Sequence, residues 1–247
     1  MFYLVGLGIG DEKDLSVRGL EIAKSCEKVY VEFYTSRTDA SKEKIEKLIG
    51  KEVVELNRGQ VEEESGYIEE AKNNDVCLLV GGDPLTATTH VEILLRCIER
   101  KIEYKIIHAS SIFTAIAETG LQLYKFGKTT TLAYPEGTYF PMTPYGVIGE
   151  NLERGLHTLI LLDIKPDKNM TASEAIGLLE EMETSEKKGL IKKGTKLVVL
   201  ARAGTDSKIW YDTIENLKKR DFGKPQHIVI YPGKLHFVEE EFLKAKG

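Results

Sequence analysis

Several features are scarce in this sequence. Its apolar runs fall far short of the roughly 20 residues that a membrane-spanning helix needs, so no membrane segment is predicted. Only three cysteines are present, Cys26, Cys77 and Cys97, and they are widely spaced, without the spacing of a zinc site. We therefore expect reduced core cysteines in a cytoplasmic protein. No basic residues precede the first apolar run, which argues against a secretory signal peptide.

A large excess of positive charge is also lacking. Lysine and arginine number 34 and aspartate and glutamate 39, which gives a formal net charge of −5. This charge provides no general attraction to nucleic acid, so no nucleic-acid partner is predicted. Hydrophobic residues make up 42% of the 247 residues, enough to bury a core. The length suits one large or two modest domains.

Common catalytic motifs are absent. The sequence has no Gly-x-Ser-x-Gly elbow, no His-Glu-x-x-His pair, no phosphate-binding loop of the ATPase type and no carboxylate cluster with metal spacing. Its five histidines are scattered singly, as structural histidines are. We assign no catalytic side chain and expect no metal. Such a chain suits a reaction in which the cofactor carries the reactive group.

Three polar turns stand out among the residues that are present. Each follows an apolar stretch that predicts a buried strand. Ligands bind outside the carboxyl ends of strands in open α/β sheets, so three turns on neighbouring strands would form a small-molecule site. The glycines of the first turn depart from the dinucleotide-binding spacing, and tight packing against neighbouring backbone explains them equally well. The turns are residues 6–10, 81–84 and 109–112.

Strands and helices alternate along the first part of the chain, which predicts a parallel α/β sheet. We expect two α/β domains, residues 1–110 and 111–247. Local patterns predict a charged helix over 60–74, a helix over 89–101 and a helix over 210–220. In the second of these, Val91, Leu94, Leu95 and Ile98 are expected on one face. Glu32 is interpreted as a solvated strand residue.

The first turn, the Gly82-Asp83-Pro84 turn and the layout of two successive halves resemble the tetrapyrrole methylase superfamily, two-domain methyltransferases that use S-adenosylmethionine. Further stretches are similar to those of the diphthine synthases, a family within it, and they span nearly the whole chain in order. These stretches are residues 83–90, 124–128, 133–137, 154–158, 200–204 and 232–236.

This resemblance implies a homodimer with the cofactor in the cleft between the two domains of each chain. It also implies trimethylation of the amino group of a 3-amino-3-carboxypropyl histidine on translation elongation factor 2, a step of diphthamide biosynthesis that releases S-adenosylhomocysteine. Methylation of a tetrapyrrole or of RNA is the alternative within the superfamily, and a nucleotide-binding module without catalysis is the alternative outside it. The residues that the resemblance assigns to the cofactor are Ile9, Asp83, Thr86, Ser111, Ile112, Leu162, Ala203 and His227.

Two roles stay open at this point. Asp83 is expected either to bind the amino acid end of the cofactor or to offset its sulfonium charge. The tail Thr88-Thr89-His90 either caps the following helix or faces the modified histidine of the partner. Aromatic faces bind trimethylammonium groups, so a further hypothesis places some of four aromatic residues around the product, with ordinary packing as its alternative. These residues are Tyr134, Tyr139, Phe140 and Tyr145.

Overall fold

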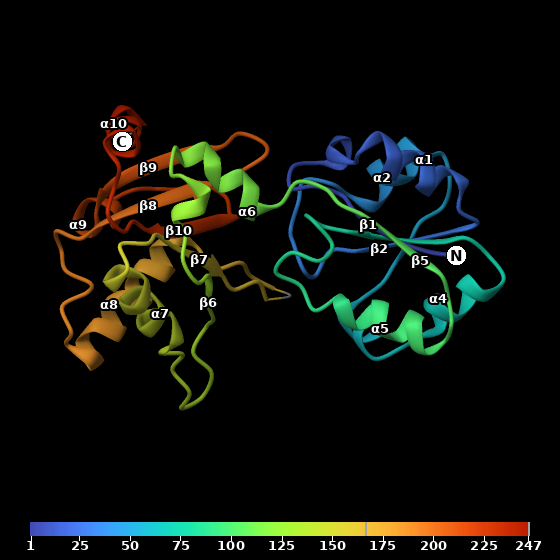
Figure 1. The fold of residues 1–247 in the computed structure, drawn as a ribbon, viewed down its shortest axis with the longest axis horizontal. Helices are drawn as coiled ribbons and strands as arrows, with labels where there is room; N and C mark the ends of the chain where they lie inside the picture. Colours follow the sequence, from blue (N-terminus) through green and yellow to red (C-terminus); the bar gives the residue numbers. More distant parts are fainter. Residues whose placement is uncertain (166, 247) are drawn as a thin grey trace. The chain divides into compact units, whose positions relative to one another are not determined.

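The computed structural model describes residues 1–165 and 167–246. The chain divides into two compact units, Met1–Ala115 and Ile116–Gly247. Each unit is built on one five-stranded sheet (Figure 1). Both units combine helices and strands, as the α/β prediction requires.

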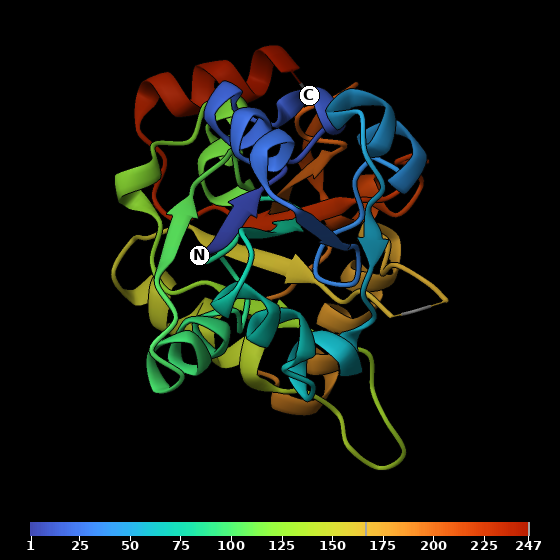
Figure 2. The same cartoon turned by 90° about the vertical axis from the view of Figure 1, so that its right-hand side faces the viewer.

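The sheet of the first unit has the strand order β3-β2-β4-β1-β5, and all of its neighbouring strands are parallel. Figure 2 shows β1 in blue and β5 in green pointing the same way. Every residue of the central strand β4 is buried, which is typical of a parallel sheet covered on both faces. The strands are β1 (Phe2–Gly6), β2 (Lys28–Glu32), β3 (Val54–Glu55), β4 (Val76–Val80) and β5 (Tyr104–Ile107).

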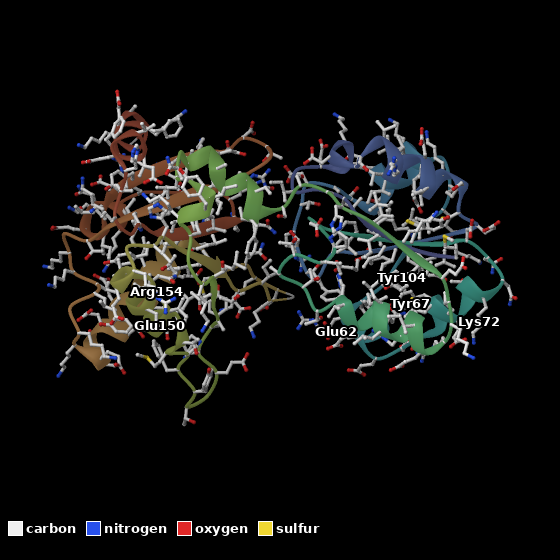
Figure 3. All side chains as sticks on the ribbon, viewed as in Figure 1. Glu62, Tyr67, Lys72, Tyr104, Glu150 and Arg154 are labelled. Carbon is white, nitrogen blue, oxygen red and sulfur yellow. The ribbon has the colours of Figure 1, made fainter. Side chains whose placement is uncertain are left out.

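Helices cover both faces of this sheet. The helices α1 (Val17–Ser25) and α2 (Lys42–Ile49) lie on one face and α4 (Gly66–Glu69) and α5 (Val91–Glu99) on the other (Figure 1). The hydroxyl of Ser16 caps α1 by accepting the Gly19 amide at 3.0 Å. On the opposite face, Tyr67 (labelled in Figure 3) packs against Phe2 and Tyr30.

The predicted charged helix over 60–74 is wrong as a single element. Its place is taken by α3 (Arg58–Glu62), α4 and the 3-10 turn η2 (Glu70–Lys72). Asn57 and Gln60 form a capping box that starts α3 early, at residue 58. Residues 63–65 then interrupt the helical run, and α4 begins at Gly66 with Ser65 in the cap position. The charged residues of segment 60–74 indicated that it is exposed, but they did not indicate how long its helices are.

The face predicted for α5 is also wrong. Ile93, Leu94 and Cys97 face the core, whereas Val91, Leu95 and Ile98 are 56%, 52% and 56% exposed. This helix carries apolar residues on two sides, so periodicity by itself could not tell which side packs on the sheet.

The second sheet has the order β6-β7-β10-β8-β9 and is mixed. The strand β6 is parallel to β7, whereas β10 runs antiparallel to both β7 and β8, and β9 is antiparallel to β8. The helices α7 (Thr143–Glu153) and α8 (Ala172–Glu186) enclose the main core of this unit with the sheet (Figure 1). The strands are β6 (Thr130–Leu132), β7 (Thr158–Leu162), β8 (Lys196–Ala201), β9 (Lys208–Thr213) and β10 (His227–Tyr231).

The helix predicted over 210–220 is wrong in its first part. Residues 208–213 form β9, and only Ile214–Leu217 form a helix, α9. Trp210 pairs with Val199 and Tyr211 with Val198 in a hairpin. Aromatic side chains favour the pleated surface of a sheet, and the neighbouring strand decides the conformation here. The remaining elements are η1 (Glu12–Asp14), α6 (Ile112–Ala115), η3 (Ile116–Thr119), η4 (Leu123–Lys125) and α10 (Phe237–Lys246).

The three cysteines are buried and unpaired. Cys26 and Cys77 lie in one core cluster of the first unit and Cys97 in the other. In the part of the chain that is described, every helix is too short or too polar to cross a membrane.

Candidate functional site

The three polar turns lie at one edge of the first sheet. Each follows β1, β4 or β5, and these strands are neighbours. The backbones of Gly8 and Gly82 are hydrogen-bonded to each other in both directions, at 3.2 and 2.7 Å. A Cβ atom on Gly6 would lie 2.6 Å from the Gly82 carbonyl oxygen, so a side chain there has no room. Backbone packing of the first turn against the second therefore explains Gly6 and Gly8.

Gly82 differs from the other two glycines. Its φ of +74° favours glycine, yet no atom lies within 4 Å of the place that its Cβ would occupy. The space beside Gly82, directly before Asp83, is therefore open. A ligand can approach the backbone closely there.

The carboxylate of Asp83 joins two of the turns. Its Oδ1 accepts hydrogen bonds from the Leu85 amide at 3.1 Å and the Thr86 hydroxyl at 3.0 Å. Its Oδ2 accepts from Nδ1 of His108 at 2.7 Å and from the Ala109 amide at 3.3 Å. Burial opposes ionisation, but these donors outweigh it and lower the pKa of Asp83. The ionised side chain holds the turn after β4 against the turn after β5.

The other predicted residues of the first unit lie on the same edge. Thr86 donates its hydroxyl to Asp83, and Ile9 precedes Gly10, whose amide donates to Asp14 at 2.8 Å. Ser111 is buried, and Ile112 begins α6. The structure thus brings five predicted cofactor residues to three adjacent turns. Contact of these residues with a cofactor stays a prediction.

Glu32 was wrongly interpreted as solvated. It ends β2 opposite Val80, it is fully buried, and burial raises its pKa. Its carboxylate accepts the amides of Tyr34 and Thr35 at 2.9 and 3.0 Å and the hydroxyl of Thr35. Glu32 therefore organises the turn next to the one that carries Asp83. An acid in an alternating strand gave no signal of this role.

The His90 side chain is structural. Its ring is buried, and its Nδ1 donates to the Pro84 carbonyl at 3.1 Å, which also accepts the Thr88 hydroxyl at 2.8 Å. Its Nε2 lies 3.4 Å from the Tyr34 hydroxyl. Residue 90 occupies the cap position of α5 without a side-chain cap bond. The ring packs under the turn, so it is not available to face a partner.

The predicted residues of the second unit also share one edge of their sheet. Leu162 ends β7, His227 begins β10, and Ala203 lies two residues beyond β8. Because β10 is antiparallel to both neighbours, its first residue lies beside the last residues of β7 and β8; His227 pairs with Ala201. Tertiary structure therefore gathers these three positions.

His227 has both ring nitrogens engaged. Its Nδ1 accepts the amide of Ala172 at 3.2 Å, and its Nε2 donates to the Lys224 carbonyl at 3.1 Å. Burial lowers its pKa, so the ring is neutral. Any contact of His227 with a ligand is left to its backbone or its ring carbons.

Each edge carries a non-glycine residue in the left-handed conformation. These residues are Ala87, with φ +57°, and Arg202, with φ +58°. The Arg202 amide donates to the Gln226 carbonyl at 2.9 Å, and the Thr205 amide and hydroxyl both donate to the Arg202 carbonyl at 3.1 Å. Such backbones cost of order 1–3 kcal/mol and cluster at functional sites. Neither residue type signals this conformation in a sequence.

The four aromatic residues proposed around the product are used differently. Tyr145 is buried in the core and donates its hydroxyl to Glu183 at 2.8 Å, so the hypothesis is wrong for this residue. Phe140 packs against the same core. Tyr139 is largely exposed beside a short bridge with Glu136. Tyr134 lies two residues beyond β6, near Leu162.

Three stretches that mark the family resemblance meet at a buried carboxylate in the second unit. Glu239 of α10 accepts the amides of Gln122 and His236 at 2.9 and 2.7 Å, and it pairs with the ammonium of Lys125. His157 donates its Nε2 proton to Glu239 at 3.1 Å and accepts the Gly233 amide on Nδ1 at 2.9 Å. We call the group of Lys125, His157 and Glu239 the clasp.

Protonation in the clasp follows from its hydrogen bonds. Burial opposes ionisation of Glu239, but donation from His236, Lys125, Gln122 and His157 lowers its pKa to about 2. Burial lowers the pKa of His157, which is therefore a neutral donor. Lys125 supplies the countercharge. The clasp fastens α10 to two loops, so stretches that mark the family resemblance serve the fold here.

Metal ligation is not indicated where the structure describes the chain: no three His, Cys, Asp or Glu side chains are grouped there to hold an ion. The predicted cofactor residues thus lie at one sheet edge in each unit, and the edge of the first unit has open space beside Gly82.

Comparison with known proteins places this geometry in a family. A family model described as tetrapyrrole (corrin/porphyrin) methylases matches residues 1–218. The chain is 52% identical to a diphthine synthase of Methanocaldococcus jannaschii, over 99% of this chain and 98% of that protein. It is 49% identical to a diphthine synthase of Methanococcus vannielii, over 99% and 98%.

Solved structures agree with these relatives. A putative diphthine synthase from Entamoeba histolytica superposes with a TM-score of 0.91 at 37% identity, covering 100% of this chain and 98% of that one. Another diphthine synthase crystal structure gives a TM-score of 0.91 at 41% identity, covering 100% and 95%.

Proposed function

The chain belongs to the tetrapyrrole (corrin/porphyrin) methylase family, and we propose that it is the S-adenosylmethionine-dependent methyltransferase of diphthine synthesis. Its substrate is then the 3-amino-3-carboxypropyl histidine of translation elongation factor 2, whose amino group it trimethylates. The observation that carries this proposal is identity of about half the residues to diphthine synthases over nearly the full length of both chains.

The residues present suit the cofactor. Open space beside Gly82 lets a ligand reach the backbone after β4. We assign Ile9, Thr86, Ser111 and Ile112 to cofactor contact in the first unit. Leu162, Ala203 and His227 complete the contacts in the second unit. S-adenosylmethionine supplies a methyl group that its sulfonium has already activated.

Asp83 takes a narrower role in this proposal than the sequence suggested. All four of its hydrogen bonds go to groups of the first unit. We infer that Asp83 is a positioning residue, which holds the turns after β4 and β5 in register. Its negative charge also offsets positive charge on a bound sulfonium. Direct hydrogen bonding to the cofactor would require one of its present donors to leave.

The chemistry asks mainly for alignment. The attacking amine must be neutral, and its lone pair must lie in line with the methyl group and sulfur. Fixing this geometry supplies several kcal/mol of the barrier reduction. We assign the proton released by the amine to water. Neither the sequence nor the described site identifies a side chain as its general base.

Transfer of labelled methyl groups to elongation factor 2 tests the proposal. Factor that carries the 3-amino-3-carboxypropyl group should gain up to three methyl groups on the amine, and unmodified factor should gain none. Tetrapyrroles and RNA serve as competing acceptors. Transfer to either of these and not to the modified factor would overturn the proposal. The net charge of −5 already disfavours RNA.

We also propose a cytoplasmic homodimer. Three unpaired, buried cysteines suit a reducing compartment. The exposed apolar side of α5, formed by Val91, Leu95 and Ile98, is a candidate for contact between subunits. Light scattering on the parent and on Leu95→Glu measures the mass; a dimeric parent and a monomeric variant are expected. A monomeric parent contradicts the dimer.

A further inference from the structure

The ring of Tyr134 already holds a positive charge. The ammonium nitrogen of Lys168 lies 3.6 Å from the ring centroid. Other lysine ammonium groups that lie over aromatic rings among the described residues are 5.0–5.9 Å away. A cation within about 6 Å of a ring face is attracted by the electron-rich face, more strongly at short distance. Tyr134 is thus a half-buried ring with a face that binds a cation.

Two carboxylates accept hydrogen bonds from Tyr134. The Tyr134 hydroxyl donates to both oxygens of Glu174 at 3.2 Å, and the Tyr134 amide donates to Asp163 at 3.0 Å. Burial, followed by the charge of Glu174, raises the pKa of Tyr134 to about 12, so the phenol stays protonated. Burial opposes ionisation of Glu174, but hydrogen bonds from Thr171 and Tyr134 lower its pKa. Glu174 is therefore ionised beside the Tyr134 hydroxyl at neutral pH.

The face lies at the same sheet edge as the predicted methyl-donor contacts. Tyr134 follows Leu132, which pairs with Leu162 in register. Glu174 lies in the first turn of α8, and the first amide of that helix, at Ala172, donates to His227. Backbone pairing thus carries Tyr134, Leu162 and His227 to one end of the second sheet.

We propose that Tyr134 and Glu174 bind the methylated amine of the substrate, and that Lys168 occupies this site when the amine is absent. This inference rests on the proposed function. In each transfer the amine lone pair forms an N–C bond, the C–S bond breaks, and its electrons stay on sulfur. Positive charge therefore develops on nitrogen, where an aromatic face and a carboxylate stabilise it.

The third transfer depends most on the ring. After the first and second transfers the ammonium loses a proton to water and the amine can attack again. After the third, nitrogen has no N–H left to donate, so hydrogen-bond acceptors gain little. The aromatic face still attracts the permanent charge. Tyr134 accordingly favours completion of the trimethylated product.

Binding of tetramethylammonium tests the site without any methyl transfer. Tetramethylammonium chloride is titrated at constant ionic strength, and the tyrosine ring signals are followed by NMR. Lys168→Ala should bind about two- to fivefold more tightly than the parent, because the competing ammonium is gone. Tyr134→Leu, in the Lys168→Ala background, should lose this binding.

Lys165→Ala is the matched control. Lys165 lies in the same segment and pairs with Glu136 at 2.5 Å and Asp163 at 3.8 Å. Its loss removes the same charge without uncovering the Tyr134 face. Equal tightening in Lys165→Ala and Lys168→Ala would mean general electrostatics and would overturn the proposal. Unchanged affinity in Lys168→Ala would overturn it too.

Product counting on modified elongation factor 2 supplies the second measurement. Tyr134→Leu should shift the products toward mono- and dimethyl forms, and Tyr134→Phe should shift them less because it keeps the ring. Tyr124→Leu, at a residue 80% exposed, is the control. Thermal unfolding of each variant excludes misfolding as the cause. An unchanged trimethyl share in folded Tyr134→Leu contradicts the inference.

The two failures are distinguishable. Absence of methyl transfer by the parent to modified factor, with tetramethylammonium bound as expected, contradicts the proposed function alone. Normal methyl transfer with no tetramethylammonium bound by Lys168→Ala contradicts the cation site alone.

Discussion

Two carboxylate–histidine pairs invite comparison, Asp83–His108 in the first unit and Glu239–His157 in the second. Each carboxylate accepts four hydrogen bonds, two on each oxygen, and in each case two donors are backbone amides and one is a histidine. The fourth donor is the Thr86 hydroxyl at Asp83 and the Lys125 ammonium at Glu239. The local chemistry is nearly the same.

Their surroundings differ. The side chain of His108 is 68% exposed, whereas those of His157 and Glu239 are fully buried. Asp83 stands beside open space at a sheet edge, and Glu239 closes the junction of α10 with two loops. One pair lies at the sheet edge that carries the predicted cofactor residues, and the other stabilises the fold. Solvent access, and not residue type, separates the two uses.

Removing the buried carboxylate should have the largest effect on stability. Glu239→Ala leaves the Lys125 charge and several donors without a partner, and breaking a buried pair in this way costs about 3–5 kcal/mol. Urea unfolding measures the loss. Glu240→Ala, next to it and exposed, should change the free energy of unfolding by less than about 0.5 kcal/mol. A loss below about 1 kcal/mol in Glu239→Ala would contradict the clasp.

Low pH should also destabilise the fold through Glu239. The pKa of Glu239 falls from its ordinary 4.5 to about 2 in the folded protein. A lowered carboxylate pKa stabilises the fold fully above 4.5, and this contribution disappears as the pH falls from 4.5 toward 2. Unfolding free energy measured against pH should therefore drop in that window. Glu239→Gln should flatten the drop, and an identical slope in both proteins would refute the assignment.

Asp83→Asn should have a smaller effect on stability and a clear effect on binding. Hydrogen bonds to a charged group contribute about 1.5–3 kcal/mol, and the exposure of the partner ring of His108 keeps the loss at the lower end. Misplaced turns should weaken binding of S-adenosylhomocysteine about tenfold, measured by calorimetry. Asp75→Asn, at the opposite end of β4, is the control. An unchanged affinity of Asp83→Asn for S-adenosylhomocysteine would contradict the assignment of Asp83 to the cofactor site.

His108→Ala should have the smallest effect. Its ring is largely in water, so loss of its bond to Asp83 should cost at most about 1 kcal/mol in thermal or urea unfolding. The other three donors keep the carboxylate in place. A loss as large as that of Glu239→Ala would show that exposure does not separate the two pairs.

Much of the first unit could be predicted because its rules are local. Apolar stretches and the turns after them indicated parallel strands and one functional edge. The errors concern the helix predicted over 60–74, which is broken into three short elements, the packed side of α5, which periodicity could not identify, and Glu32, whose burial depends on a neighbouring turn. Residues 210–213 were misjudged because β8, a distant strand, determines their conformation.

The candidate site was only partly predictable. The family resemblance named eight positions, and the structure gathers five at one sheet edge and three at another. The resemblance did not reveal that the carboxylate of Asp83 accepts hydrogen bonds from four protein groups. Nor did it reveal that Ala87 and Arg202 adopt left-handed backbone, or that Lys168 covers the ring of Tyr134. Such features depend on contacts, and a single sequence carries no signal for them.

The sequence by itself determined the α/β class, the order of the turns and the family, because periodicity, glycine placement and motif order act over short distances along the chain. Tertiary structure alone decided that Asp83 lies at an open sheet edge and that Glu239 closes the junction of α10 with two loops. His157 and Glu239 are 82 residues apart, and no local rule links them. Burial sets what each pair does, and burial exists only after distant elements have packed together.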